Sequence, residues 1–201
     1  MIYSKGSIVM IILLIVCSYL LGNLLSGSII SKFFYKQEIH VQGSGNPGAR
    51  NLGRLYGRKA FIFTFIGDAL KGALVVMAAK TLGFGSAIEL LALFAVLLGH
   101  VYPILYGFRG GKGVSTFIGG FLLFNPMAFM IFIGVFLIFY AFIKSFTVAG
   151  MIAILSFPII IFMYGSNLSS IFIASFISGL IIYAHRENIT EKTKGRKEPS
   201  Q

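Results

Sequence analysis

Long apolar runs, separated by short polar segments, dominate this chain. Five of the runs approach the length of about 20 apolar residues that an α-helix needs to cross a bilayer. They occupy residues 7–25, 60–80, 87–106, 146–164 and 168–184. The pattern therefore predicts a bundle of membrane-spanning helices.

The stretch between residues 114 and 143 decides how often the chain crosses. It carries no charged residue, but Asn125-Pro126 interrupts it, and proline ends or kinks a helix. As one long span it gives six crossings in all, and as a short helix followed by a full one it gives seven. At about 1.5 Å per residue, a helix over 114–124 is too short to cross a bilayer alone, so it either extends through Pro126 or tilts under its neighbours.

The positions of the basic residues favour seven crossings. Only Lys5 and Lys80 then fall on one side of the membrane, and Lys71 lies inside a span. The basic segments on the other side are 32–59, 109–112, 144 and 186–197. Because Lys and Arg mark the cytoplasmic side, we expect an all-α polytopic membrane protein with about seven transmembrane helices, its N-terminus outside and its C-terminus in the cytoplasm.

The composition agrees with this fold class. The chain has 201 residues, of which 57% are hydrophobic and 11% are charged, whereas a soluble domain carries about 25% charged residues. The length suits one integral-membrane domain over residues 1–201, with a polar tail from about residue 190.

The net charge of +11 raises the question of a nucleic-acid partner. The cations lie in short segments between apolar runs and form no continuous basic face, so the sequence predicts no nucleic-acid binding. Cys17 is the single cysteine and excludes an internal disulfide. The three histidines have no cysteine partners at metal-binding spacing, so we expect no metal and no cofactor.

The first of three polar clusters covers residues 43–54. Its glycines leave the backbone free to turn and to approach a ligand closely, and Ser and Asn side chains add neutral hydrogen bonds. An arginine at its end can grip phosphate with its forked donors. The alternative is an ordinary turn. The expected phosphate-binding residues here are Ser44, Gly45, Asn46, Asn51 and Arg54.

The second cluster covers residues 109–116, just ahead of an apolar helix. A helix start offers unpaired N–H groups and a partial positive charge, both of which favour anions. The nucleotide-binding pattern G-x-x-x-x-G-K-[ST] fails, because a glycine follows the lysine. The alternative is a positive-inside loop with helix-breaking glycines. The expected anion ligands are Gly111, Lys112, Gly113 and Thr116.

The third cluster, at residues 185–188, directly follows the last apolar run. His185 and Asn188 are three positions apart and share a face if the helix continues. The alternative is a polar helix terminus. Asp68 and Lys71, inside the second run at i, i+3, are expected to pair with each other, because unpaired charge in a membrane is costly.

These clusters together resemble the bacterial acyl-phosphate:glycerol-3-phosphate acyltransferases, the PlsY family. The likeness rests on residues 44–54, 67–72, 99–116 and 185–188, in this order within a membrane protein of this size. It implies transfer of an acyl chain from acyl phosphate to the 1-hydroxyl of glycerol 3-phosphate, which gives lysophosphatidic acid and phosphate. It also implies seven transmembrane helices in the bacterial inner membrane, with the site facing the cytoplasm.

The resemblance also implies roles for single residues. Ser44, Arg54 and Lys112 match family positions that bind substrate phosphate, and His185 and Asn188 match its terminal active-site motif. We expect catalysis to involve His185, Asn188 and Lys112. Arg50 stands where the family usually has Thr, which indicates either altered substrate preference or a paralogue with reduced or no activity.

The chemistry fits this reaction independently of the family. An acyl phosphate is already activated, so the enzyme mainly needs positioning and stabilisation of developing negative charge. The H-x-x-x-x-D motif of other acyltransferases is absent, because the residues five positions after the three histidines are Gly45, Leu105 and Thr190. The alternative from another class is a small transporter of an anionic metabolite, which would carry polar groups at mid-membrane and an inverted repeat.

Overall fold

The computed structural model describes residues 5–186, and within them the chain is helical with no strand. The α-helices are α1 (Lys5–Gly22), α2 (Ser26–Phe34), α3 (Ala49–Tyr56), α4 (Arg58–Thr81), α5 (Ser86–Val101), α6 (Val114–Phe124), α7 (Pro126–Ile143), α8 (Phe146–Met163) and α9 (Leu168–Ala184). Two 3₁₀ turns, η1 (Ile39–Val41) and η2 (Ile104–Tyr106), lie in the connections. The all-α prediction is confirmed.

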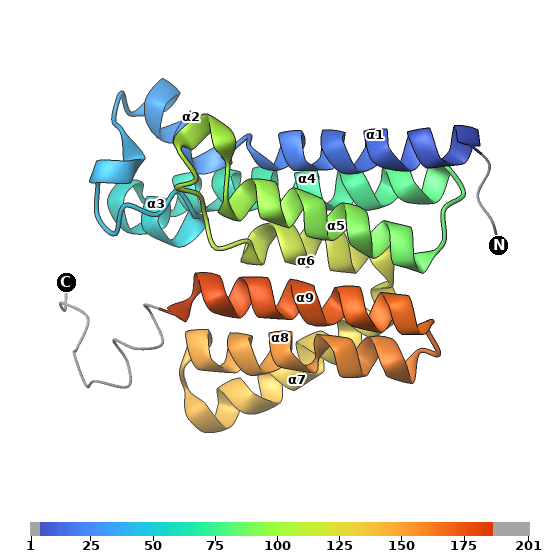
Figure 1. Cartoon of the computed structure of the whole chain (residues 1–201). Helices are drawn as coiled ribbons and strands as arrows, with labels where there is room; N and C mark the ends of the chain where they lie inside the picture. The colour runs from blue at the N-terminus through green and yellow to red at the C-terminus, as the bar shows by residue number, and fades with distance from the viewer. Residues whose placement is uncertain (1–4, 187–201) are drawn as a thin grey trace.

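The long helices lie side by side, and the short helices α2 and α3 gather at one end of the bundle (Figure 1). Helix α4 packs on α6, α1 packs on α5, and α7 and α8 form a hairpin that α9 joins. Glycine allows the close approaches: a Cβ on Gly72 would overlap the Thr116 carbonyl oxygen across the α4–α6 interface, and one on Gly99 would overlap the Tyr19 carbonyl oxygen across α1–α5. Small residues serve the same purpose in other membrane bundles.

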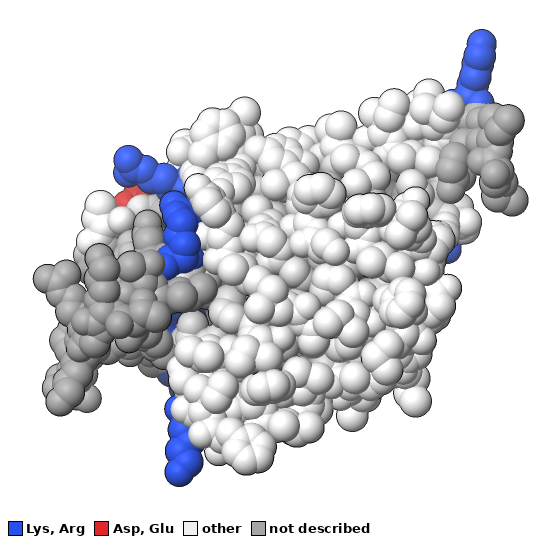
Figure 2. Space-filling view, turned by 60° about the horizontal axis from the view of Figure 1, so that its bottom comes forward, with Lys and Arg blue, Asp and Glu red and all other residues white. Residues whose placement is uncertain are grey.

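An aromatic core joins α6, α7 and α8. Phe121 and Phe157 lie with ring centroids 4.5 Å apart, and Phe117 meets Phe157 edge-on at 5.0 Å. Outside this core, apolar side chains cover the bundle's surface, which Figure 2 shows as a broad uncharged area with most of the visible Lys and Arg along one edge. A surface of this kind suits lipid, because hydrocarbon replaces water around it.

The interruption at Asn125-Pro126 separates two helices, as the sequence predicted. The Asn125 side chain accepts a hydrogen bond from the backbone N–H of Ala128 at 3.0 Å, and Pro126 opens α7 at a position where its missing N–H is not needed. By length and composition, five helical segments of the described chain are long and apolar enough to span a membrane, while α6 and α9 are apolar but shorter.

The third predicted span matches a candidate span over Ser86–Tyr106, although its last residues are not α-helical, and two helices were missed. The third apolar run ends as an α-helix at Val101, because Pro103 cannot continue it, and residues 104–106 form η2 instead. Helices α2 and α3 were not predicted, since each is short and lies in a stretch that reads as polar connection.

Candidate active site

The loops of the first two polar clusters and the end of α9, which His185 follows, lie at one end of the bundle, the end where α2 and α3 lie (Figure 1). A Cβ on Gly113 would come within 3.8 Å of the Ile181 side chain in the last turn of α9. The charges of Lys112 and Arg50 both act on the His185 imidazole. Segments that are far apart in the sequence therefore share one region.

The side-chain amide of Asn51 shapes the first loop. Its Oδ1 accepts the backbone N–H of Ser44 at 3.1 Å, and its Nδ2 donates to the carbonyls of Gln42 (3.1 Å) and Asn46 (2.9 Å). The residue is buried, and Gly43, at φ +55°, supplies the left-handed backbone that the turn needs. Asn51 thus organises the loop through its own hydrogen bonds.

Asn46 and Ser44 lie in the same loop but differ in their contacts and exposure. The Asn46 side chain accepts the Gly48 N–H at 2.8 Å, just before α3 begins, and Gly45 has a φ of +69°. Ser44 is exposed to the outside of the loop.

Helix α3 carries two arginines on one face. Arg50 and Arg54 are four positions apart, and the Arg50 Nη1 donates to the Thr147 Oγ1 of α8 at 3.1 Å. Arg50 therefore spans from α3 to the α7–α9 side of the bundle, next to the expected site. Its sequence position gave no sign of this contact, because Thr147 lies 97 residues away.

The second loop presents Lys112 at the start of α6. The backbone N–H of Gly111 donates to the His100 carbonyl at 3.0 Å, and Gly113, at φ +81°, turns the chain into the helix. Lys112 is half-buried between these glycines. Thr116, by contrast, is fully buried where α6 packs on α4, so it belongs to the helix interface and not to the loop surface.

His185 is the C-cap of α9, directly after its last residue. It is buried, and its Nδ1 lies 2.8 Å from the Ile181 carbonyl oxygen, which can only accept, so Nδ1 carries the proton. In the neutral ring Nε2 is then the nitrogen that can accept a proton. Burial lowers the pKa of His185 below its ordinary value of 6.5; the Ile181 carbonyl opposes this, and the positive charges of Lys112 and Arg50 lower it further. Asn188, predicted beside it, lies outside the described residues.

The predicted pair of Asp68 and Lys71 is confirmed, with Lys71 Nζ 3.1 Å from Asp68 Oδ1. The sequence did not reveal a third member: His100 Nδ1 lies 2.7 Å from Lys71 Nζ. Within residues 5–186, no group of three His, Cys, Asp or Glu side chains could hold a metal ion.

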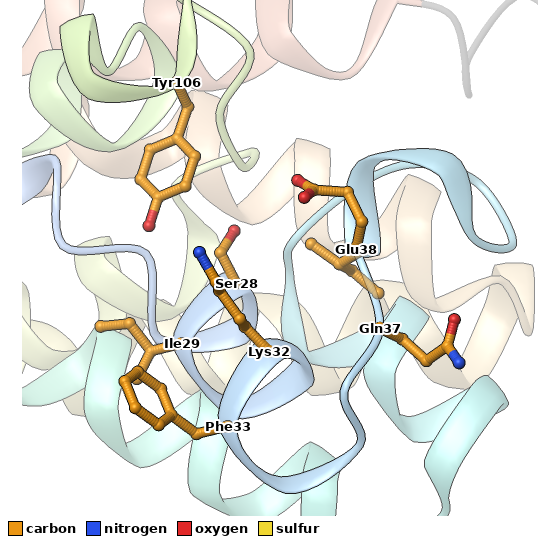
Figure 3. Close-up of a pocket in the computed structure, with 8 residues that line it drawn as sticks. Ser28, Ile29, Lys32, Phe33, Gln37, Glu38 and Tyr106 are labelled. Carbon is orange, nitrogen blue, oxygen red and sulfur yellow. The ribbon is translucent and has the colours of Figure 1, made fainter.

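A hollow of about 340 Å³ lies beside α2. Figure 3 shows Lys32, Ser28 and Tyr106 pointing toward one another there, with the Glu38 carboxylate nearby. None of the predicted site residues lines it. Its mixture of one cation and one carboxylate fits a phosphate less well than the glycine loops do.

The chain is similar to known proteins along nearly its full length. The family model described as glycerol-3-phosphate acyltransferase matches residues 12–195. Glycerol-3-phosphate acyltransferase 1 of Bacillus cereus is 45% identical over 175 residues, covering 87% of this chain and 96% of the relative. Glycerol-3-phosphate acyltransferase 1 of Desulfitobacterium hafniense is 36% identical over 188 residues, covering 94% and 93%.

Solved structures agree with the sequence relatives. The crystal structure of PlsY, an integral membrane glycerol 3-phosphate acyltransferase, in its glycerol 3-phosphate form has a TM-score of 0.85 and 33% identity, covering 95% of this chain and 96% of that one. Its lysophosphatidic acid form has a TM-score of 0.82 and 34% identity, covering 94% of each. The chain therefore belongs to the glycerol-3-phosphate acyltransferase family, of which PlsY is a member.

Proposed function

We propose that this protein transfers an acyl chain from acyl phosphate to the 1-hydroxyl of glycerol 3-phosphate, releasing lysophosphatidic acid and inorganic phosphate. The observation that carries the proposal is that the charge of Lys112 acts on the His185 imidazole, at the end of the bundle where both glycine loops lie (Figure 1). Relatives that cover almost all of the chain carry the name of this activity.

The reaction needs little more than positioning. The hydroxyl oxygen of glycerol 3-phosphate attacks the acyl carbon, a new C–O bond forms, and the bond from that carbon to the phosphate oxygen breaks. Negative charge develops on the carbonyl oxygen and stays on the departing phosphate. Cations and backbone N–H groups stabilise both, which suits a site with Lys, Arg and glycine loops.

The described residues divide the work in this proposal. Lys112 and Arg54 hold phosphate with their charges, and the Ser44 hydroxyl adds a hydrogen bond. His185 takes the hydroxyl proton on Nε2, because its Nδ1 is occupied by the Ile181 carbonyl and its lowered pKa keeps the ring neutral near pH 7. Asn51 contributes by shaping the loop that presents Ser44.

We further propose seven membrane crossings in the bacterial inner membrane, with the N-terminus outside and the C-terminus in the cytoplasm. The support is that the segments at 43–54, 109–116 and 185 lie at one end of the bundle, while α1 begins and α4 ends at the other, with Lys5 in the first turn of α1 and Lys80 in the last turn of α4 (Figure 1). To test it, Cys17 is replaced by Ala and a single cysteine is placed at Ser169 or at Lys59. An impermeant thiol reagent added outside intact cells should label position 169 and not position 59, and labelling of position 59 would contradict the orientation.

Phosphate release by the purified full-length protein tests the reaction. With palmitoyl phosphate alone we expect slow release, and addition of glycerol 3-phosphate should accelerate it and give one lysophosphatidic acid per phosphate. Movement of glycerol 3-phosphate across liposomes without acyl transfer would instead support a transporter. Protein that binds neither substrate would support a non-catalytic paralogue.

A further inference from the structure

A polar cluster lies buried in the bundle beneath the loop of residues 110–113. Asp68 and Lys71 come from α4 and His100 from the last turn of α5, and their exposed fractions are 1%, 4% and 2%. Charged side chains inside a membrane bundle are costly and are kept where they pair or serve a function. The proposed reaction assigns none of the three to substrate, so their placement needs another explanation.

Lys71 is the centre of this cluster. Its ammonium donates to the carbonyls of Gly22 and Leu24, both at 3.1 Å, and pairs with Asp68 at 3.1 Å. Because an ammonium only donates, the His100 Nδ1 at 2.7 Å is the acceptor, and the neutral ring carries its hydrogen on Nε2. Lys71 therefore ties the end of α1 to the end of α5.

Asp68 connects a third segment to the cluster. Its Oδ1 lies 3.4 Å from the backbone N–H nitrogen of Ser26, the first residue of α2, and 3.8 Å from His100 Nδ1. The chain runs from α2 into the loop that carries Ser44. The cluster thus also holds the start of α2, the helix that precedes the first glycine loop.

His100 contacts the second loop directly. Its carbonyl accepts the Gly111 N–H at 3.0 Å, and a Cβ on Gly111 would overlap the Nε2 of its ring. A Cβ on Gly110 would overlap the same carbonyl oxygen. The loop therefore contacts both the backbone and the imidazole of His100. These contacts are made at Gly111, one residue before Lys112.

We infer that Asp68, Lys71 and His100 are positioning residues, which fix the loop of residues 110–113 so that Lys112 faces the substrate phosphate. This inference rests on the proposed function. A glycine-rich loop loses much conformational freedom when it is ordered, and a rigid support orders it before substrate arrives. A cation held in place binds phosphate better than one that must be ordered at each turnover.

His100→Leu tests the inference in the purified full-length protein. The change removes both ring nitrogens and the contact of the ring with Gly111, yet keeps the backbone hydrogen bond from Gly111, the Asp68–Lys71 pair and the contacts of Lys71 with α1. We expect kcat/KM to fall by about tenfold to a hundredfold, mainly through a higher KM for glycerol 3-phosphate. The matched control is Ser170→Ala, which removes a hydrogen bond of an equally buried side chain, from Ser170 Oγ to Asn167 Oδ1 at 2.9 Å, in the first turn of α9 and so at the opposite end of that helix from Ile181. It should leave KM unchanged.

A double-mutant cycle with Lys112→Ala separates positioning from general stability. If His100 acts through Lys112, His100→Leu should change the activity of Lys112→Ala by less than about threefold. Losses that multiply in the double variant would overturn the inference, as would an unchanged KM in folded His100→Leu. If His100→Leu does not give monodisperse protein, Asp68→Asn combined with Lys71→Met removes both charges together, and the same cycle is measured with it.

The controls also separate this inference from the proposed function. Wild-type protein that transfers no acyl chain from palmitoyl phosphate would overturn the proposed reaction. Active wild-type protein with multiplying losses in the cycle would overturn only the positioning role. In the first case the inference falls with the reaction on which it rests.

Discussion

The buried cluster of Asp68, Lys71 and His100 contains both signs of charge, whereas the two charges that act on His185 are both positive. In the buried cluster, Lys71 and Asp68 have protein partners within hydrogen-bonding distance. The positive charges around His185 lie at the end of the bundle, where the glycine loops and half-buried Lys112 are found. A balanced buried cluster is suited to holding backbone in place, and a concentration of positive charge at an accessible end is suited to attracting anions.

The difference suggests how a membrane protein divides its few charges. Only 11% of the residues are charged, so each charge in the bundle has a marked effect. In the proposed account, the charges that serve structure are buried together in the interior, and the charges that bind phosphate lie at the end of the bundle where a substrate can reach them. Variants of the buried cluster should therefore lose stability, whereas a variant of Lys112 should lose activity.

The largest effect is expected from breaking the buried cluster. Lys71→Ala leaves the Asp68 carboxylate without its cation in the interior, and such a change costs about 3–5 kcal/mol. The thermal unfolding midpoint of the purified protein in detergent should fall clearly. Asp68→Asn combined with Lys71→Met removes the charges as a pair and should cost less, so a double variant less stable than Lys71→Ala would contradict the balanced-cluster account.

Lys112→Ala should show the opposite behaviour: an intact fold with little activity. Loss of one charged group that stabilises a developing anion costs about a hundredfold to a thousandfold in turnover. Phosphate release and the unfolding midpoint are measured on the same preparation. The matched control is Lys59→Ala, an exposed cation in the first turn of α4, which should keep nearly full activity. Near-normal turnover by Lys112→Ala would remove this lysine from the site.

The smallest effect is expected from Arg50→Thr, in the dependence of activity on pH. Arg50 is one of the charges that lower the pKa of His185, so Arg50→Thr should raise that pKa toward its ordinary value. If neutral His185 takes the proton, activity is lost as pH falls through this pKa, and the acidic limb of the profile should move to higher pH. Arg50→Lys keeps the charge and should leave the limb in place.

The same variant tests whether Arg50 is tolerated. Above the acidic limb, Arg50→Thr should retain or raise transfer, because it restores the residue usual in the family and removes one of several crowded cations. Complete loss of activity would identify Arg50 as a substrate ligand in this protein, and an unmoved limb would contradict its action on His185.

The membrane helices could be predicted because lipid imposes a simple rule on sequence. A spanning segment must be apolar over most of its length. Proline breaks a helix, so Pro126 was expected to divide the uncharged stretch over 114–143. Helices α2 and α3 escaped prediction because nine and eight residues are too few to show a clear period among glycines and cations.

The candidate site could be predicted only in part. Glycine and cation patterns located the loops around Ser44 and Lys112, but patterns along the chain do not show where a side chain points. Asn51 was predicted to bind substrate, and the structure shows its amide within its own loop. Thr116 was predicted as a ligand and lies in a helix interface. The contact of His100 with Lys71 joins residues 29 positions apart on different helices, which no local pattern reveals.

The choice of acyl donor tests the central claim most directly. The account holds that the site relies on a donor that brings its own good leaving group and its own phosphate. One preparation of the purified protein is given palmitoyl phosphate or palmitoyl-CoA at equal concentration with glycerol 3-phosphate, without added metal or nucleotide. We expect lysophosphatidic acid from palmitoyl phosphate, matched one-to-one by inorganic phosphate, and little or none from palmitoyl-CoA. Equal turnover of the two donors would contradict the account, even though the membrane fold would stand.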